Sequence, residues 1–319
     1  MRRRLIIAVV VAAALAASVL ALALSGGSSV RRSLVYEVDG SIWRANMDGS
    51  RPVRLASGTN PQIAPDGRLV AFTRVSPTSG VFLIPAAGGN AEVIKGLAAG
   101  NPNLVWAPNS RLLAVGADDG LHVVDVRSGA QRFIAEASIA YSSVFSPDSR
   151  SLVYELPERN GGSNLHVVNL ESDKTRRLTR LGAATLAVWG PKEIAFSFND
   201  EIWLVDGNGK QLRQLGQGLI IGASYGAPAG WSADGKLLLA VGPVEIAMIA
   251  VSSGKVLFSG AKGDLLLGLS RDGQVALTSN CVYSFFGNRL SSGGVATIPL
   301  DGGRPRMLVR GACSASWNA

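Results

Sequence analysis

The pentapeptide GASYG at positions 222–226 has the G-x-S-x-G spacing of a serine hydrolase nucleophile. That chemistry needs a strand, a sharp turn and a helix around Ser224, together with an acid and a histidine. The residues that follow are APAGWSADG, which begin another unit of a repeated β pattern, and the chain contains only His122 and His166 as histidines. We therefore predict a small-residue loop at this motif and no catalytic serine.

The two histidines occupy the same position in successive sequence repeats. In the other repeats that position holds Trp43, Phe82, Trp203, Ala247 and Ala296. A metal site needs ligands that converge on one point, whereas equivalent positions in neighbouring repeats point along separate units. The Asp-Gly turns lack the distal glutamate of a calcium loop. The sequence thus predicts no metal site and no cofactor, and a packing role for both histidine rings.

The elements that must position these residues come from a repeat of about 42 residues. A large apolar residue precedes a tight turn at Ile63, Trp106, Phe145, Trp189, Trp231, Leu269 and Trp317. Turn sequences such as APDG and SPDS follow, and then short apolar runs that are typical of strands. Four strands in each repeat are the blade of a β-propeller. We predict an all-β, seven-bladed β-propeller, with six or eight blades as alternatives because the units at 33–56 and 266–310 are the least regular.

The incomplete units at the two ends of this repeat array complement each other. SLVYEVDG from Ser33 matches SLVYELPE from Ser151, which is the second strand of a blade, so the first unit lacks its innermost strand. The last anchor residue, Trp317, belongs to one additional strand after a complete blade. We expect residues 312–318 to supply the innermost strand of the first blade and so close the ring without free inner edges.

The repeat resembles the WD-like repeats of TolB-type propellers. The pattern is clearest in FSPDSRSLVYE and NLHVVNLESDKTRRLT, between Phe145 and Thr179, and it extends over residues 33–319. The resemblance implies the propeller fold and a TolB-like role in an envelope complex. Seven blades, where TolB itself has six, is a departure from the family.

The distribution of charged and apolar residues near the N-terminus predicts that the protein is located at a membrane. The net charge is +8, and the five arginines that flank the apolar segment, at positions 2–4, 31 and 32, leave +3 for the rest. Residues 5–24 are apolar apart from Ser18 and would span ~30 Å as a helix. We expect residues 1–32 to be a signal anchor, or a signal peptide cleaved near Ala21–Ala23, with the propeller extracytoplasmic. No basic stripe with interleaved aromatic residues indicates nucleic-acid binding.

Two loops break the repeat, at 216–230 and 280–294, and the strand order places both on the same face of the ring. Loops that depart from a repeat commonly carry its binding function. The predicted partner site therefore comprises Tyr225, Tyr283, Phe285, Phe286 and Arg289, residue types that are enriched in binding hot spots. The alternative is that Phe285 and Phe286 fold back to plug the ring.

The chain contains two cysteines, Cys281 and Cys313. The expected compartment permits a disulfide, and the topology places both residues on one face at the seam between the last and first blades. We predict a Cys281–Cys313 disulfide that fastens the closing strand, with two separately buried thiols as the alternative.

Taken as a sequence, the chain is interpreted as an extracytoplasmic scaffold that binds a protein partner at the cell envelope and is not an enzyme. The alternative function is an envelope enzyme that acts on a glycan or peptide in the central funnel through carboxylates that the sequence does not identify.

Overall fold

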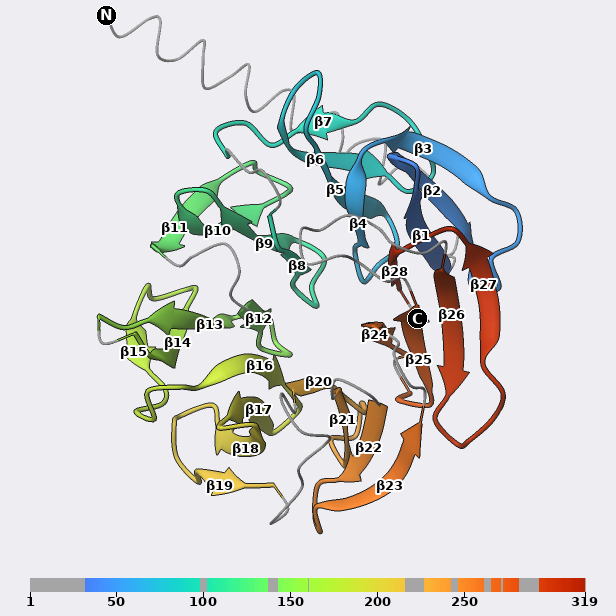
Figure 1. The fold of residues 1–319 in the computed structure, drawn as a ribbon. Coiled ribbons are helices and arrows are strands. Elements are labelled where there is room, and N and C mark those ends of the chain that lie inside the picture. Colours follow the sequence, from blue (N-terminus) through green and yellow to red (C-terminus); the bar gives the residue numbers. More distant parts are fainter. Residues whose placement is uncertain are drawn as a thin grey trace, which may run out of the picture.

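The computed structural model describes residues 32–97, 102–136, 143–159, 161–215, 227–241, 246–260, 265–270, 272–280 and 293–318. These residues form seven four-stranded antiparallel sheets arranged in a ring, as Figure 1 shows. No helix occurs among them, so this part of the chain contains none that is long and apolar enough to cross a membrane. The prediction of a seven-bladed β-propeller is confirmed.

The blades follow the chain in order from inner to outer strand. The first blade combines β28 (Ser314–Trp317), β1 (Ser33–Val38), β2 (Ser41–Asn46) and β3 (Val53–Ser57). The second blade consists of β4 (Thr59–Ile63), β5 (Leu69–Arg74), β6 (Gly80–Pro85) and β7 (Glu92–Val93). The third consists of β8 (Leu104–Trp106), β9 (Leu112–Ala117), β10 (Gly120–Asp125) and β11 (Gln131–Ala135). The fourth consists of β12 (Ser143–Phe145), β13 (Ser151–Pro157), β14 (Ser163–Asn169) and β15 (Thr175–Arg177). The fifth blade consists of β16 (Thr185–Trp189), β17 (Glu193–Phe198), β18 (Glu201–Asp206) and β19 (Arg213–Gln214). The sixth consists of β20 (Ala227–Trp231), β21 (Leu237–Val241), β22 (Ile246–Ala250) and β23 (Lys255–Gly260). The seventh consists of β24 (Leu265–Leu269), β25 (Val275–Ser279), β26 (Gly294–Pro299) and β27 (Arg306–Arg310).

Each predicted anchor residue is the last residue of an inner strand, and the turns after Ile63, Trp106, Phe145, Trp231 and Leu269 are held by their own side chains. In the fourth blade Ser146 donates its hydroxyl to Asp148 at 2.5 Å, and Asp148 accepts the backbone N–H of Arg150 at 3.0 Å. This local pairing satisfies the turn backbone and explains why Ser, Asp and Gly recur there. These five turns therefore form from local sequence in the same way.

The ring closes as the sequence predicts. β28 pairs antiparallel with β1, with Leu34 opposite Trp317 and Tyr36 opposite Ala315. The backbone N–H of Ser33 donates to Asn318 Oδ1 at 2.7 Å, so the two ends of the propeller are tied side by side. The closing strand thus completes the first blade with residues from the opposite end of the domain.

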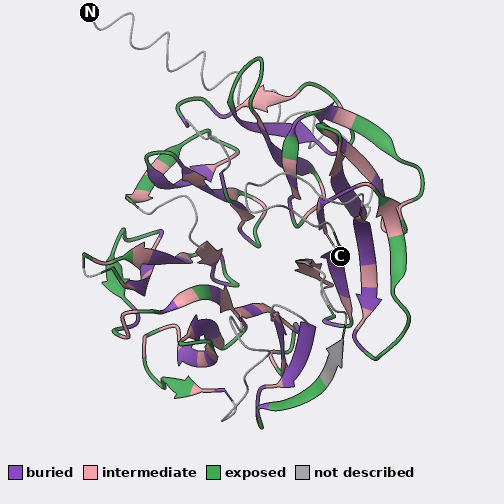
Figure 2. Cartoon of the chain, in the orientation of Figure 1, coloured by how far each residue is buried: buried purple, intermediate pink, exposed green. Residues whose placement is uncertain are grey.

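The core is divided into seven apolar clusters, one at each seam between adjacent blades. Second and third strands such as β5 and β6 are almost entirely buried, whereas the outer strands β3, β15 and β27 are largely exposed. Figure 2 shows this gradient from the middle of the blades to the rim. Stability therefore comes from blade-to-blade packing, and each seam offers a boundary at which a site can form.

The antiparallel order gives the ring two different faces. The turns from inner to second strand and from third to outer strand open on one side, which we call the turn face. The connections from second to third strand and from each blade to the next open on the other side, which we call the loop face. The predicted binding loops connect strands at the loop face, where the backbone N–H of Gly294 donates to Asn280 Oδ1 at 2.6 Å.

Candidate functional site

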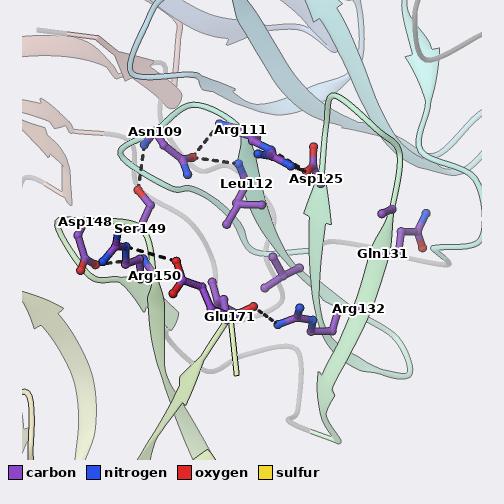
Figure 3. Close-up of a pocket in the computed structure, with 13 residues that line it drawn as sticks. Asn109, Arg111, Leu112, Asp125, Gln131, Arg132, Asp148, Ser149, Arg150 and Glu171 are labelled. Atoms are coloured by element: carbon purple, nitrogen blue, oxygen red, sulfur yellow. Dashed lines mark hydrogen bonds and ion pairs between the residues drawn. The ribbon is translucent and has the colours of Figure 1, made fainter. Parts of the chain in front are cut away.

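A cleft of about 470 Å³ opens on the turn face between the third and fourth blades (Figure 3). It is built from five short segments that are separated in sequence. The third blade contributes the turn before β9, the end of β10 and the start of β11, and the fourth contributes the turns before β13 and β15. The apolar floor and the polar wall consist of Leu112, Val123, Ala130, Leu170, Asn109, Arg111, Asp125, Gln131, Arg132, Asp148, Ser149, Arg150 and Glu171.

The firmest charged contact in the cleft joins the start of β9 to the end of β10. Arg111 Nε and Nη2 donate to Asp125 Oδ2 at 2.7 and 2.5 Å, and the Asp125 side chain is only 13% exposed. Burial favours the protonated carboxyl, but hydrogen bonds from Arg111 and from the backbone N–H groups of Arg127 and Ser128 outweigh it, so the pKa of Asp125 lies below its ordinary value. Asp125 is therefore a fixed anion at the third-blade end of the cleft.

The other two arginines of the cleft pair with exposed carboxylates. Arg132 Nη1 donates to the Leu170 carbonyl oxygen at 2.7 Å and lies 2.8 Å from Asp173. Arg150 Nε lies 3.4 Å from Glu171, and both of those side chains are about two-thirds exposed. Exposed ion pairs contribute ~0–1 kcal/mol to stability, so a ligand can displace them at little cost.

The turns of the two blades are also joined across the seam. The Asn109 backbone N–H donates to Ser149 Oγ at 3.0 Å. Ser149 has a φ of 61°, in the left-handed region, whereas glycine with φ of 71° occupies the same turn position at Gly235. A serine is strained in this backbone conformation, but its hydroxyl supplies a hydrogen-bond acceptor to the preceding blade. This bond fixes the inner end of the cleft.

The lining of the cleft carries three arginines and three carboxylates, so it has no net charge. An apolar floor inside a polar, charged rim is the composition of protein interfaces, and the volume falls in the range of ligand pockets. No group of three or more histidine, cysteine, aspartate or glutamate side chains suited to a metal ion exists among the described residues. The arrangement is suited to holding a polypeptide segment of mixed charge.

A second polar cluster lies on the loop face of the fourth blade. Glu155 is 2% exposed and accepts hydrogen bonds from the Ser163 side chain and the Leu186 backbone N–H, and burial raises its pKa. Asn164 Oδ1 accepts hydrogen bonds from Thr179 and from the backbone that follows it, whereas the buried Asn164 Nδ2 has no hydrogen-bond partner among the described residues. This cluster fixes the connection between the fourth and fifth blades.

The structure does not test the predicted partner site. Tyr225, Tyr283, Phe285, Phe286 and Arg289 all lie outside the described residues, as do Ser224 and the apolar segment 5–24. They stay predictions. The cleft opens on the turn face, whereas the strands that flank the two predicted loops meet them at the loop face.

Both histidines lie in the equivalent positions that the repeat predicts. His122 Nε2 lies 2.8 Å from Asp119, and its ring meets the edge of Phe133 with centroids 5.3 Å apart. The His166 ring packs on Tyr154, with centroids 5.9 Å apart. Burial, followed by the charge of Arg177, lowers the pKa of His166. The predicted packing role of the two rings is what these contacts show.

Cys313 is buried and is not a free thiol. It immediately precedes the closing strand β28, at the seam where the last blade meets the first. Its predicted partner Cys281 lies outside the described residues. The Cys281–Cys313 pairing therefore stays a prediction.

Sequence reasoning missed the cleft. One available signal was the arginine that directly follows the turn in the second, third and fourth repeats, at Arg68, Arg111 and Arg150. Of these three repeats, only the third has an aspartate at the end of the second strand after the arginine. That residue, Asp125 at the end of β10, pairs with Arg111. That combination marks the third blade as different from its neighbours.

The fold and its seam define the class of protein as a closed seven-bladed β-propeller. No protein-family model and no curated protein sequence matches the chain. Among solved structures, TolB from Acinetobacter baumannii matches with a TM-score of 0.55 and 17% identity over 94% of this chain and 70% of that one. A chain of the nidogen–laminin complex matches with a TM-score of 0.50 and 13% identity, over 72% of this chain and 92% of that one. The TolB-type resemblance is thus confirmed at the level of fold.

The prediction that the chain is not an enzyme is contradicted by the comparison with solved structures. The tricorn protease matches with a TM-score of 0.62 and 14% identity, over 86% of this chain and 34% of that one. Puromycin hydrolase and acylaminoacyl peptidase also match, with 16% and 13% identity. A propeller of this shape therefore occurs within enzymes. The blade repeat specifies packing, and it does not exclude catalysis.

Proposed function

We propose that this protein is a propeller that binds a partner polypeptide in the cleft between its third and fourth blades, on the extracytoplasmic side of a membrane. The observation that carries the proposal is the cleft itself, with Leu112 and Leu170 in its floor and charged side chains around them. A partner would bury apolar groups on the floor while Arg132 and Arg150, whose carboxylate partners are exposed, re-pair with its polar groups.

The proposed extracytoplasmic location rests on the sequence. Three arginines precede the apolar segment 5–24, and this bias favours an N-terminus that stays cytoplasmic and a propeller that lies outside. Protease added to intact cells, with any outer barrier permeabilised, should digest the propeller. Protection of the propeller while a known external domain is digested would refute the topology, and a mature N-terminus near residue 24 would show cleavage in place of anchoring.

The binding site is tested by filling the cleft. Ala130 is exposed and lines the cleft, so Ala130→Trp places a large ring in it without disturbing the core. Lys210 occupies the equivalent hairpin position in the fifth blade, because its carbonyl accepts from Asp206 as that of Ala130 accepts from Asp125. Lys210→Trp is therefore the matched control, on a blade that contributes nothing to the cleft.

The assay selects short random peptides by display on the purified full chain, followed by affinity measurement with labelled peptides. We expect Ala130→Trp to weaken binding by roughly tenfold or more, the effect of losing ~1.4 kcal/mol, while Lys210→Trp binds normally. Equal affinity of both variants would show that the cleft is not the site. Cleavage of the bound peptide in the same assay would instead identify a peptidase activity.

A further inference from the structure

The outer strand of the third blade continues the cleft to the rim of the propeller. Ala130, Gln131 and Arg132 line the cleft, and the last two begin β11. β11 is the edge strand of its sheet, in the order β11-β10-β9-β8. An edge strand has backbone N–H and C=O groups that point away from its own sheet and can pair with another chain.

The register identifies which groups these are. Asp125 N donates to the Ala130 carbonyl at 2.9 Å, and His122, Val123 and Val124 stand opposite Phe133, Arg132 and Gln131. Hydrogen-bonded and non-hydrogen-bonded pairs alternate in an antiparallel ladder, so the Val123–Arg132 pair is the next bonded one. The backbone groups of Gln131 and Phe133 therefore face outward.

Most other outer strands carry features that discourage pairing. β7, β15 and β19 have only two or three residues. β3 directly follows Pro52, β23 begins with Lys255, and β27 has Arg306 and Arg310 at its ends. Short strands, proline and outward charges are the devices that block edge-to-edge association. β11 has five residues and one charge, on Arg132, which is held toward the cleft by the Leu170 carbonyl.

The side chains of β11 present two different surfaces to an added strand. Phe133 is 50% exposed and is held edge-on by the ring of His122, which is itself 8% exposed. Arg132 lies on the opposite side of the strand, beside the exposed Asp173 at 2.8 Å. Successive residues of a strand point to opposite faces, so a paired strand would set alternate residues beside Phe133 and beside Arg132.

We propose that β11 is a docking edge, and that the partner adds an extended segment to it as a fifth strand of the third blade. The segment places an apolar residue beside Phe133 and an acidic residue beside Arg132, where it replaces Asp173, and its continuation enters the cleft. This inference rests on the proposed function, because it describes how the partner polypeptide reaches the cleft. Backbone pairing supplies affinity and the alternate side chains supply selectivity.

The first test separates the outward backbone donor from the aromatic ring. Phe133→Ala removes the ring alone, and Phe133→Pro removes the ring and the outward N–H while leaving the β10 ladder intact. With the tightest peptide from the selection on the full chain, we expect Phe133→Pro to bind about 3- to 10-fold more weakly than Phe133→Ala. Leu257→Ala, at a residue 55% exposed on β23, is the matched control and should bind normally.

The second test reads the pairing directly. Peptide binding should slow amide hydrogen exchange at Gln131 and Phe133 of the full chain. N-methylation of the peptide at successive positions should weaken binding at every other position, because only alternate N–H groups of an added strand face β11.

The outcomes distinguish the two proposals. If Ala130→Trp abolishes binding while Phe133→Pro matches Phe133→Ala and exchange at β11 is unchanged, the cleft binds the partner and strand addition is refuted. If Ala130→Trp has no effect, or if no peptide binds at all, both proposals fall.

Discussion

The closing strand offers a sharp test of how the ring is held together. Ser316 is the third residue of β28, and its hydroxyl accepts the backbone N–H of Ile63 at 3.2 Å. Both residues are buried, at 9% and 4% exposure. This contact joins the last strand of the chain to the inner strand of the second blade, in addition to its pairing with β1.

Ser316→Ala should leave the Ile63 N–H buried without an acceptor. Orphaning a buried donor costs ~1–3 kcal/mol, whereas the small change in side-chain size costs little. For a domain somewhat larger than 150–250 residues, each kcal/mol lowers Tm by ~2–4 °C, so the expected decrease is roughly 2–10 °C.

Ser314→Ala is the matched control. Ser314 lies two residues earlier on the same strand and faces the same side, but it is partly exposed, and its hydroxyl makes no hydrogen bond to any described residue. Thermal unfolding followed by tryptophan fluorescence, with urea titration for the free energy, measures both variants. A Ser316→Ala loss no larger than that of Ser314→Ala would refute the claim that this bond secures the closure.

Three further predictions concern buried charge and the closing seam. Burial raises the pKa of Glu155 in the folded protein above its ordinary 4.5, so the ionised carboxylate destabilises the fold progressively as pH rises above that value. The Tm of Glu155→Gln should therefore equal that of the wild type at pH 4 and below and exceed it at pH 7. Parallel Tm–pH curves for the two proteins would contradict the argument. The lowered pKa of Asp125 contributes stability above pH 3.8 that is lost as pH falls through the folded pKa; Arg111→Ala should lower Tm at neutral pH by an amount that shrinks in acid, and a pH-independent difference would point to lost packing instead. Alkylation of the denatured, unreduced protein should add no groups if Cys281 and Cys313 are bonded, and two groups on mass spectrometry would disprove the bond.

The sequence is a good guide wherever a structural feature is local. Each anchor from Ile63 to Trp317 ends an inner strand, and five of the turns that follow are held by side chains within five residues of the anchor. The repeat spacing set the blade number for the same reason. Closure by β28 also followed from the sequence, since an array that lacks one inner strand at its start and has one extra at its end has one way to complete its blades.

Function was less accessible to sequence reasoning. Departures from the repeat directed attention to residues 216–230 and 280–294, while the cleft formed on the turn face from segments that keep the repeat pattern. The exclusion of enzymes failed because the blade pattern records packing and says nothing of what chemistry a propeller accompanies.

Sequence alone determined the all-β repeat, the seven blades, the closing strand and the apolar segment at residues 5–24. Only the tertiary structure decided that Arg111, Arg132 and Arg150 meet around one apolar floor, that Asp125 is buried enough to anchor its end, and that the outer edge β11 continues this cleft. The physical reason is distance along the chain. Turn and strand propensities act between residues a few positions apart, whereas a cleft between blades depends on how two sheets pack at their seam.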